Sequence, residues 1–219
     1  MNTKNILIKA AAAATMWLTC MAIILLVVGC NTACAPELEA DPAEADTSPP
    51  EVVEEEPAED AWITWDTCSQ IPGNHPCNFE LMDQNGEMVE LYDFHEKVII
   101  LDLSAMWCGV CNNIASKGDE LVNDYGAENL IWITVLIDDA TGEAPDLTDL
   151  QYWVTTYGIN TPVLAGDRTM IDSTAQTGYP ISSWPTLVVI DQNMVLRYGI
   201  NGWSESMIRN WIESLVNGY

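Results

Sequence analysis

Three stretches of the chain, 97–105, 129–138 and 186–191, are almost wholly apolar and rich in β-branched residues. Runs of this length between polar segments predict strands that are buried on both faces of a sheet. A shorter stretch, 194–199, follows the third run after an Asp-Gln-Asn turn and predicts a further strand. These four stretches make up the predicted sheet.

Between the strands, the apolar positions recur at helical spacing. The segment 111–126 has this spacing and ends in glycine, and 147–158 and 203–219 also predict helices, whereas 162–179 is mixed. The resulting order β-α-β-α-β-β-α predicts an α/β domain with a mixed sheet and helices on both faces.

The segment before the first long strand predicts a β-hairpin. Within 78–91, two stretches of alternating polarity flank Asn85-Gly86, a pair that favours the tight turn of a hairpin. The residues LYDF at its end, 91–94, predict a short helical turn. The domain is therefore expected to open with an N-terminal hairpin.

The N-terminus has a separate pattern. Lys4 and Lys9 precede an apolar run over 10–29, and the run ends in VVGC at Cys30, which resembles the lipidation box of bacterial lipoproteins. This resemblance implies a signal peptide over 1–29 and a lipid on Cys30. The run is also long enough to be an uncleaved membrane anchor, and a fully released protein is a third possibility. In each case the remainder of the chain would lie outside the inner membrane.

Residues 30–60 are proline-rich, and from residue 31 to residue 60 they contain 11 acidic residues and no Lys or Arg. Such a segment cannot bury enough apolar surface to offset its ordering entropy, so we expect a disordered, self-repelling tether. The sequence does not specify the state of Cys34, which lies within it. The folded domain is expected to span 61–219.

Charge excludes one class of partner. The chain has 33 Asp and Glu against seven Lys and Arg, giving a net charge of -26. A polyanion repels nucleic acid, so nucleic-acid binding is not expected.

The main candidate for chemistry is a pair of cysteines, Cys108 and Cys111, placed where a predicted strand gives way to a predicted helix. Backbone N–H groups at a helix N-terminus favour negative charge, so Cys108 is expected to react as a thiolate. Cys111 lies within the first helical turn, close enough to attack a mixed disulfide formed on Cys108. Trp107, just before the pair, would cover the site and help to exclude water.

The stretch LDLSAMWCGVC resembles the active-site region of the thioredoxin superfamily, whose motif is WCGPC after a buried strand. That family has a cis-proline facing the cysteines and commonly a threonine after it, and Trp184, Pro185 and Thr186 match this pattern before a strand. The similarity covers roughly 78–219. The hairpin, the inserted residues and the tether are similar to the extracytoplasmic TlpA/ResA-like branch, the redoxins.

The resemblance adds a carboxylate to the site. Thioredoxins carry a buried acid six residues before the first cysteine, and Asp102 occupies that position. Its apolar neighbours should raise its pKa and let it exchange a proton with Cys111. The alternative is a solvated, structural acid at a strand end.

The chain departs from the family pattern at two positions. Val110 replaces the proline of thioredoxin itself, and since the two central residues of the motif tune the reduction potential, the direction of electron flow stays open. The family pairs the backbone of the residue before the cis-proline with an extended partner peptide. A tryptophan there, Trp184, either narrows the choice of partner or packs on Trp107, and we favour packing.

A second cysteine pair, Cys68 and Cys77, frames a loop-like segment, CSQIPGNHPC. In an oxidising compartment a structural disulfide is the natural interpretation, with a second redox relay to Cys108 as the alternative. The pair has the wrong spacing for a zinc knuckle. His75 and His95 are expected near surface turns, and no metal is predicted.

The sequence thus predicts an extracytoplasmic thiol–disulfide oxidoreductase, monomeric and without a cofactor. Client proteins are the expected substrates, and a membrane electron donor is implied by the resemblance. One alternative is a thiol peroxidase of the peroxiredoxin type, although Ala105 and Leu101 stand where that family places Thr or Ser and Pro. The other is a redox-inactive binding module.

Overall fold

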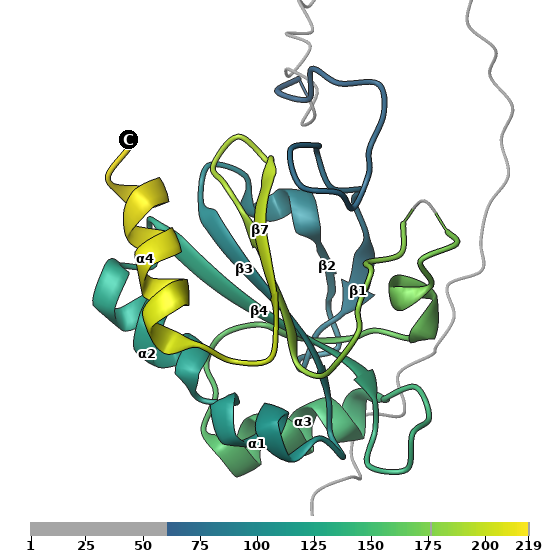
Figure 1. The fold of residues 1–219 in the computed structure, drawn as a ribbon. Coiled ribbons are helices and arrows are strands. Elements are labelled where there is room, and N and C mark those ends of the chain that lie inside the picture. Colours follow the sequence, from purple (N-terminus) through teal and green to yellow (C-terminus); the bar gives the residue numbers. More distant parts are fainter. Residues whose placement is uncertain (1–60, 176, 219) are drawn as a thin grey trace, which may run out of the picture. The chain divides into compact units, whose positions relative to one another are not determined.

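The computed structural model describes residues 61–175 and 177–218. The expected signal segment, the acidic tether and the lipidation site at Cys30 lie outside these residues. The domain is built on a five-stranded sheet in the order β5-β4-β3-β6-β7. Figure 1 labels β3, β4 and β7 of this sheet. Its strands are β3 (Val98–Ala105), β4 (Leu130–Asp138), β5 (Val163–Ala165), β6 (Thr186–Ile190) and β7 (Leu196–Asn201).

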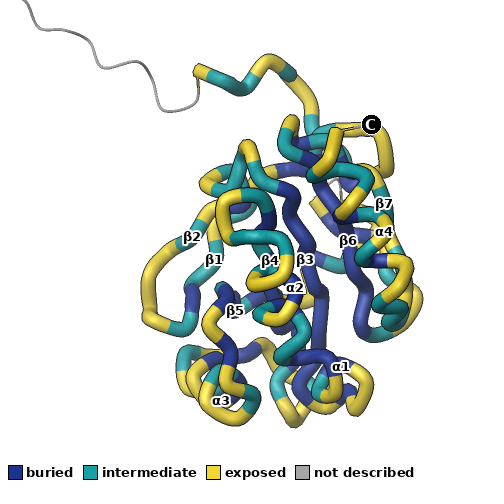
Figure 2. Tube along the Cα trace, turned by 90° about the vertical axis from the view of Figure 1, so that its left-hand side faces the viewer, coloured by how far each residue is buried: buried dark blue, intermediate teal, exposed yellow. Residues whose placement is uncertain are grey.

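The pairing of these strands makes the sheet mixed. β3 pairs with β4 in parallel, and β4 pairs with β5 in parallel. β3 pairs antiparallel with β6, and β6 pairs antiparallel with β7. The central strand, β3, is buried along its whole length, as the apolar run at 97–105 predicted (Figure 2).

The α-helices cover one face of the sheet. They are α1 (Gly109–Ile114), α2 (Lys117–Tyr125), α3 (Leu147–Tyr157) and α4 (Glu205–Val216). Alternate residues of β3, Val98 and Ile100, pack on this face with Ile114 of α1 and Ile208 of α4. Near the cysteines, Trp153 of α3 joins the same side of the sheet.

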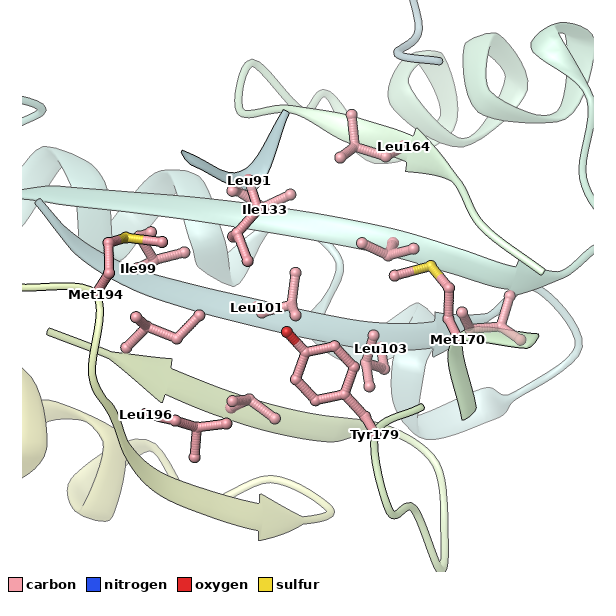
Figure 3. Close-up of a cluster of buried hydrophobic side chains, with 14 residues drawn as sticks. Leu91, Ile99, Leu101, Leu103, Ile133, Leu164, Met170, Tyr179, Met194 and Leu196 are labelled. Atoms are coloured by element: carbon pink, nitrogen blue, oxygen red, sulfur yellow. The ribbon is translucent and has the colours of Figure 1, made fainter. Parts of the chain in front are cut away.

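The other face is covered by two 3₁₀ helices, η1 (Leu91–Phe94) and η2 (Arg168–Ile171), and by the hairpin β1 (Glu80–Met82) and β2 (Met88–Glu90). Leu101 and Leu103 of β3 point into this second cluster, where they meet Tyr179 and Met170 (Figure 3). The predicted helices on both faces are therefore present, but those on the second face are short 3₁₀ turns.

The hairpin follows the sequence prediction. β1 pairs antiparallel with β2, and the Asp83 carboxylate accepts hydrogen bonds from the backbone N–H groups of Asn85 and Glu87 within the turn. Gly86 has a φ of 83°, which glycine adopts without strain. The Asn-Gly pair therefore marks the turn.

Two features of the fold differ from the sequence expectation. The helix expected over 111–126 is interrupted between α1 and α2, and the mixed stretch 162–179 contains β5, a third parallel strand, as well as η2. Within the part of the chain that the structure describes, no helix is long and apolar enough to cross a bilayer.

Candidate active site

The backbone places Cys108 at the end of β3. After Ala105 the chain turns, with the Cys108 N–H donating to the Ala105 carbonyl at 3.0 Å, and Cys108 becomes the N-cap residue of α1. Its sulfur accepts a hydrogen bond from the Cys111 N–H at 3.3 Å. This contact stabilises negative charge on the Cys108 sulfur, as expected for a residue at a helix N-terminus.

The two cysteines differ in exposure. Both are free thiols; Cys108 is 7 % exposed and Cys111 is fully buried. Cys108 lines an open cavity of about 700 Å³ together with Trp107, Val110, Ser183 and Trp184. A partner's disulfide can therefore approach Cys108 from this cavity, whereas Cys111 lies behind it.

Burial dominates the electrostatics of Cys111. Loss of solvation raises the pKa of its thiol, and the hydrogen bond with Cys108 raises it further. Hydrogen bonds from the Ala105 backbone and the Ser104 side chain act in the opposite direction. A buried thiol of this kind needs a base before it can react.

Asp102 provides a candidate base. Its side chain is 1 % exposed in the middle of β3, and burial raises its pKa to about 7. Two hydrogen bonds oppose that rise: Ser104 Oγ donates to Oδ1 at 2.6 Å and Thr134 Oγ1 donates to Oδ2 at 3.3 Å. The predicted burial of Asp102 is therefore present, and the side chain is not a solvated acid at a strand end.

Trp107 lies beside the cavity with 48 % of its surface exposed. Its Nε1 donates to Asp138 Oδ2 at 3.0 Å, and Arg168 Nη2 donates to the same oxygen at 2.5 Å. Asp138 is fully buried at the end of β4. Because the carboxyl ends of the parallel strands β3 and β4 meet at one edge of the sheet, Asp138 reaches the residue that follows β3.

The segment before β6 forms the other wall of the cavity. The Trp184–Pro185 peptide bond is cis, and the rings of Trp184 and Trp107 make an edge-to-face contact with their centroids 6.0 Å apart. The expected packing of Trp184 on Trp107 is thus present. Thr186 is 5 % exposed, and its hydroxyl donates to the Ser183 carbonyl at 2.8 Å, so it anchors the cavity-lining loop from behind.

The structure brings most of the sequence candidates together. Cys68 and Cys77 form a disulfide, as the sequence predicted for this pair. His75 and His95 are half-buried and stack on Trp65 and Trp62, with centroid distances of 3.6 and 4.3 Å. Among residues 61–175 and 177–218, no group of three His, Cys, Asp or Glu side chains could hold a metal ion.

Sequence reasoning missed four residues of the site: Ser104, Thr134, Asp138 and Arg168. A signal for Ser104 was present, since residues two apart on a strand share a face and 104 follows 102. Asp138 was signalled by its place at the end of the neighbouring parallel strand. Nothing in the sequence pointed to Arg168, which comes from the mixed stretch after β5.

A dithiol at a strand–helix junction, faced by a cis-proline segment and backed by a buried carboxylate, defines a thioredoxin-like protein. In a comparison with known protein families, residues 72–199 match the AhpC/TSA family. The chain belongs to the AhpC/TSA family.

Individual relatives narrow the class. Thiol-disulfide oxidoreductase ResA of Halalkalibacterium halodurans is 25 % identical over 143 residues, which cover 64 % of this chain and 75 % of that protein. The exposed lipoprotein thioredoxin of Streptococcus pneumoniae is 26 % identical with a TM-score of 0.52, covering 64 % of this chain and 100 % of that one. A structure described as a candidate thiol:disulfide interchange protein DsbE from Chlorobium tepidum has a TM-score of 0.55 at 21 % identity. The match covers 67 % of this chain and 98 % of that one.

These relatives confirm the predicted resemblance to the ResA-like branch and the predicted thioredoxin-like fold. The two ResA relatives also confirm the class of activity, thiol–disulfide oxidoreductase.

Proposed function

We propose that Cys108 and Cys111 exchange electrons with the disulfides and thiols of client proteins. In the reducing direction the Cys108 thiolate attacks a client disulfide, and the first client sulfur leaves as a thiolate. Cys111 then attacks Cys108, releasing the second client thiolate, so the client gains the two electrons that the pair loses. The observation that carries this proposal is the placement of Cys108 at a cavity, with Cys111 buried directly behind it.

The walls of the cavity would hold the client. Trp107, Val110 and Trp184 give it an apolar lining next to the Cys108 sulfur. The backbone beside Pro185 would pair with an extended client segment, as in the family that the motif resembles. Thr186 would keep this loop in place through its hydrogen bond to the Ser183 carbonyl.

We propose that the domain works outside the cytoplasm, held to a membrane through a lipid on Cys30 and supplied with electrons by a membrane donor. The VVGC box and the acidic segment 30–60 support a tethered enzyme in the cell envelope, facing the periplasm, and we expect this enzyme to be a monomer. The Cys68–Cys77 disulfide fits an oxidising compartment. A relative of 26 % identity carries the name exposed lipoprotein thioredoxin.

Reduction of insulin by dithiothreitol tests the function. The wild type should accelerate it, whereas Cys108→Ser should fall to the uncatalysed rate because the attacking sulfur is gone. As a matched control, the double variant Cys68→Ala/Cys77→Ala should keep its activity, since that pair lies outside the cavity. Equal rates for Cys108→Ser and the wild type would favour a redox-inactive binding module.

The peroxidase alternative makes a different prediction. The positions where a peroxiredoxin would have peroxide-binding groups hold Ala105 and Leu101, both fully buried and apolar. Mixing the reduced protein with hydrogen peroxide should therefore leave the Cys108 thiol largely intact on the timescale of insulin turnover. Rapid stoichiometric oxidation of Cys108 would overturn the proposal in favour of a peroxidase.

A further inference from the structure

The loop that carries Trp184, residues 182–185, has no helix or strand of its own and is held in place by its neighbours. It forms one wall of the cavity described above, where Trp184 contacts Trp107 with the ring centroids 6.0 Å apart. The loop also forms hydrogen bonds with the end of β7, the strand that pairs with β6. There Asn201 lies directly opposite Thr186, the first residue of β6.

The side chain of Asn201 holds this loop at both of its ends. Its Oδ1 accepts a hydrogen bond from the Ser182 N–H at 3.2 Å. The same oxygen lies 2.8 Å from the Thr186 hydroxyl. That hydroxyl also lies 2.8 Å from the Ser183 carbonyl, so its one hydrogen is shared between two acceptors. One amide oxygen therefore connects the residue that opens the loop to the residue that follows it.

The residue after Asn201 adds a further hydrogen bond to the loop. The Gly202 N–H donates to the Pro185 carbonyl at 2.7 Å, and its φ of 89° is a conformation that glycine adopts without strain. The backbone is thus held on either side of Trp184. Asn201 is exposed and is not among the residues that line the cavity, so any effect it has on the site acts through the loop.

We propose that Asn201 is a positioning residue for client binding, which keeps the loop 182–185 in the conformation that an extended client segment pairs with. A loop that has to be ordered during binding costs affinity, because its conformational entropy is lost at that moment. A small disulfide that reaches Cys108 without touching the loop gains nothing from this order. Asn201 therefore favours polypeptide disulfides over small-molecule disulfides. This inference rests on the proposed function.

Two disulfides with the same leaving group separate binding to the loop from the chemistry of Cys108. One is a neutral, extended peptide whose central cysteine is joined to mercaptoethanol, and the other is hydroxyethyl disulfide, which has no backbone for the loop to bind. Reduced full-length protein is mixed with each at several concentrations and quenched with acid, and peptide mapping by mass spectrometry follows oxidation of the Cys108–Cys111 pair. A wild type that stays reduced with both disulfides would contradict the proposed function itself, whereas the variants below test Asn201.

Asn201→Ala should raise the peptide concentration that gives half the maximal rate roughly three- to tenfold, because hydrogen bonds that order the loop are lost. The maximal rate, and the rate with hydroxyethyl disulfide, should stay at the wild-type value. Asn201→Asp keeps an acceptor oxygen in the same place and should recover most of the affinity. If Asn201→Ala folds poorly, Asn201→Ser, which also lacks the amide oxygen, gives the same comparison.

Asn78→Ala is the matched control. Asn78 is also exposed, and its Oδ1 accepts hydrogen bonds from the N–H groups of Phe79 and Tyr92, outside the lining of the cavity. This variant should react with both disulfides as the wild type does. If Asn201→Ala behaves like this control, or slows the reactions with both disulfides by the same factor, Asn201 does not position the loop for clients and the proposal is wrong.

Discussion

Asp102 has a measurable consequence for stability. A carboxyl whose pKa rises from 3.8 in the unfolded chain to about 7 in the folded protein takes up a proton on folding at pH values between these two. As the pH rises from about 4 to about 7, the unfolded chain ionises first, so the folded state loses stability; above about pH 7 the penalty is constant.

Asp102→Asn removes this penalty. It should therefore raise the free energy of unfolding by roughly 2–4 kcal/mol at about pH 8 and change it little at about pH 4. Urea unfolding of both proteins at the two pH values checks this. A variant less stable than the wild type at the higher pH would mean that Asp102 is not destabilised by burial. The same variant should lose oxidoreductase turnover, since an amide cannot accept the proton.

Arg168 acts on the site through Asp138 and Trp107. Arg168→Met leaves a fully buried carboxylate with the Trp107 indole as its remaining side-chain donor. Because the Arg168 side chain is 65 % exposed, solvent screens the pair, and we expect a loss of about 1–3 kcal/mol in the free energy of unfolding. Attack on a client disulfide should also slow, since Trp107 is less firmly held.

The control for that variant is Arg197→Met, which breaks the ion pair of Arg197 with another buried carboxylate, Asp191. It should cost stability without changing the rate at which Cys108 attacks a client. Equal effects of the two variants on that rate would show that Asp138 and Arg168 do not position Trp107.

At the scale of single elements, α2 is fixed by a close approach to the sheet. A Cβ built on Gly118 would lie 2.4 Å from Cγ of Trp132, a fully buried side chain of β4. Gly118→Ala should therefore cost about 1–3 kcal/mol of stability through overpacking, although alanine is the better helix former by about 1 kcal/mol. Gly109→Ala in α1, where a Cβ meets nothing within 4 Å, should be neutral or slightly stabilising. Thermal unfolding of both variants measures the difference, and an equally tolerated Gly118→Ala would contradict this packing.

The loop closed by Cys68 and Cys77 is the second element whose contribution to stability can be predicted. The two cysteines are separated by nine positions, so replacing both by alanine should lower the free energy of unfolding by about 2–3 kcal/mol on the loop-entropy estimate. Chemical denaturation of the double variant measures this loss. A stability equal to that of the wild type would mean that the unfolded segment is restrained in other ways.

The elements could be predicted wherever one physical signal dominates. Continuous apolar runs gave β3, β4 and β6, and Asn85-Gly86 gave the hairpin, because burial on both faces and a tight turn leave plain patterns. β5 was missed because three residues are too short to show a period. The break between α1 and α2 was missed because neither Ala115 nor Ser116 is a helix breaker, so the local sequence holds no signal for it.

The residues of the site also divide into those that a local sequence pattern predicts and those that it does not. The cysteine motif, Asp102 and the segment around Pro185 could be predicted because their spacing is fixed by a strand–helix junction and by a known family pattern. Asp138 and Arg168 come from other parts of the chain and meet Trp107 only through the fold. Their contribution could not be derived from neighbouring residues in the sequence.

At the scale of the whole molecule, charge should select clients. Residues 61–219 contain 22 acidic residues against five Lys and Arg, so the domain itself is a polyanion. At low salt, a cationic peptide disulfide should react with Cys108 roughly ten- to a hundredfold faster than an anionic one of the same length. The difference should largely vanish at about 1 M salt, where the screening length is about 3 Å. If the rate of reaction with Cys108 did not depend on peptide charge, the negative electrostatic field of the domain would not reach the cavity beside Cys108.

The central claim is that Cys108 attacks client disulfides and Cys111 releases them. Replacing the releasing thiol in Cys111→Ser and adding a disulfide-bonded client tests it directly, since the first adduct then has no internal route to resolve. The account predicts a stable mixed disulfide that peptide mapping by mass spectrometry places on Cys108. An adduct on Cys68, Cys77 or a cysteine before residue 61, or no adduct at all, would contradict it.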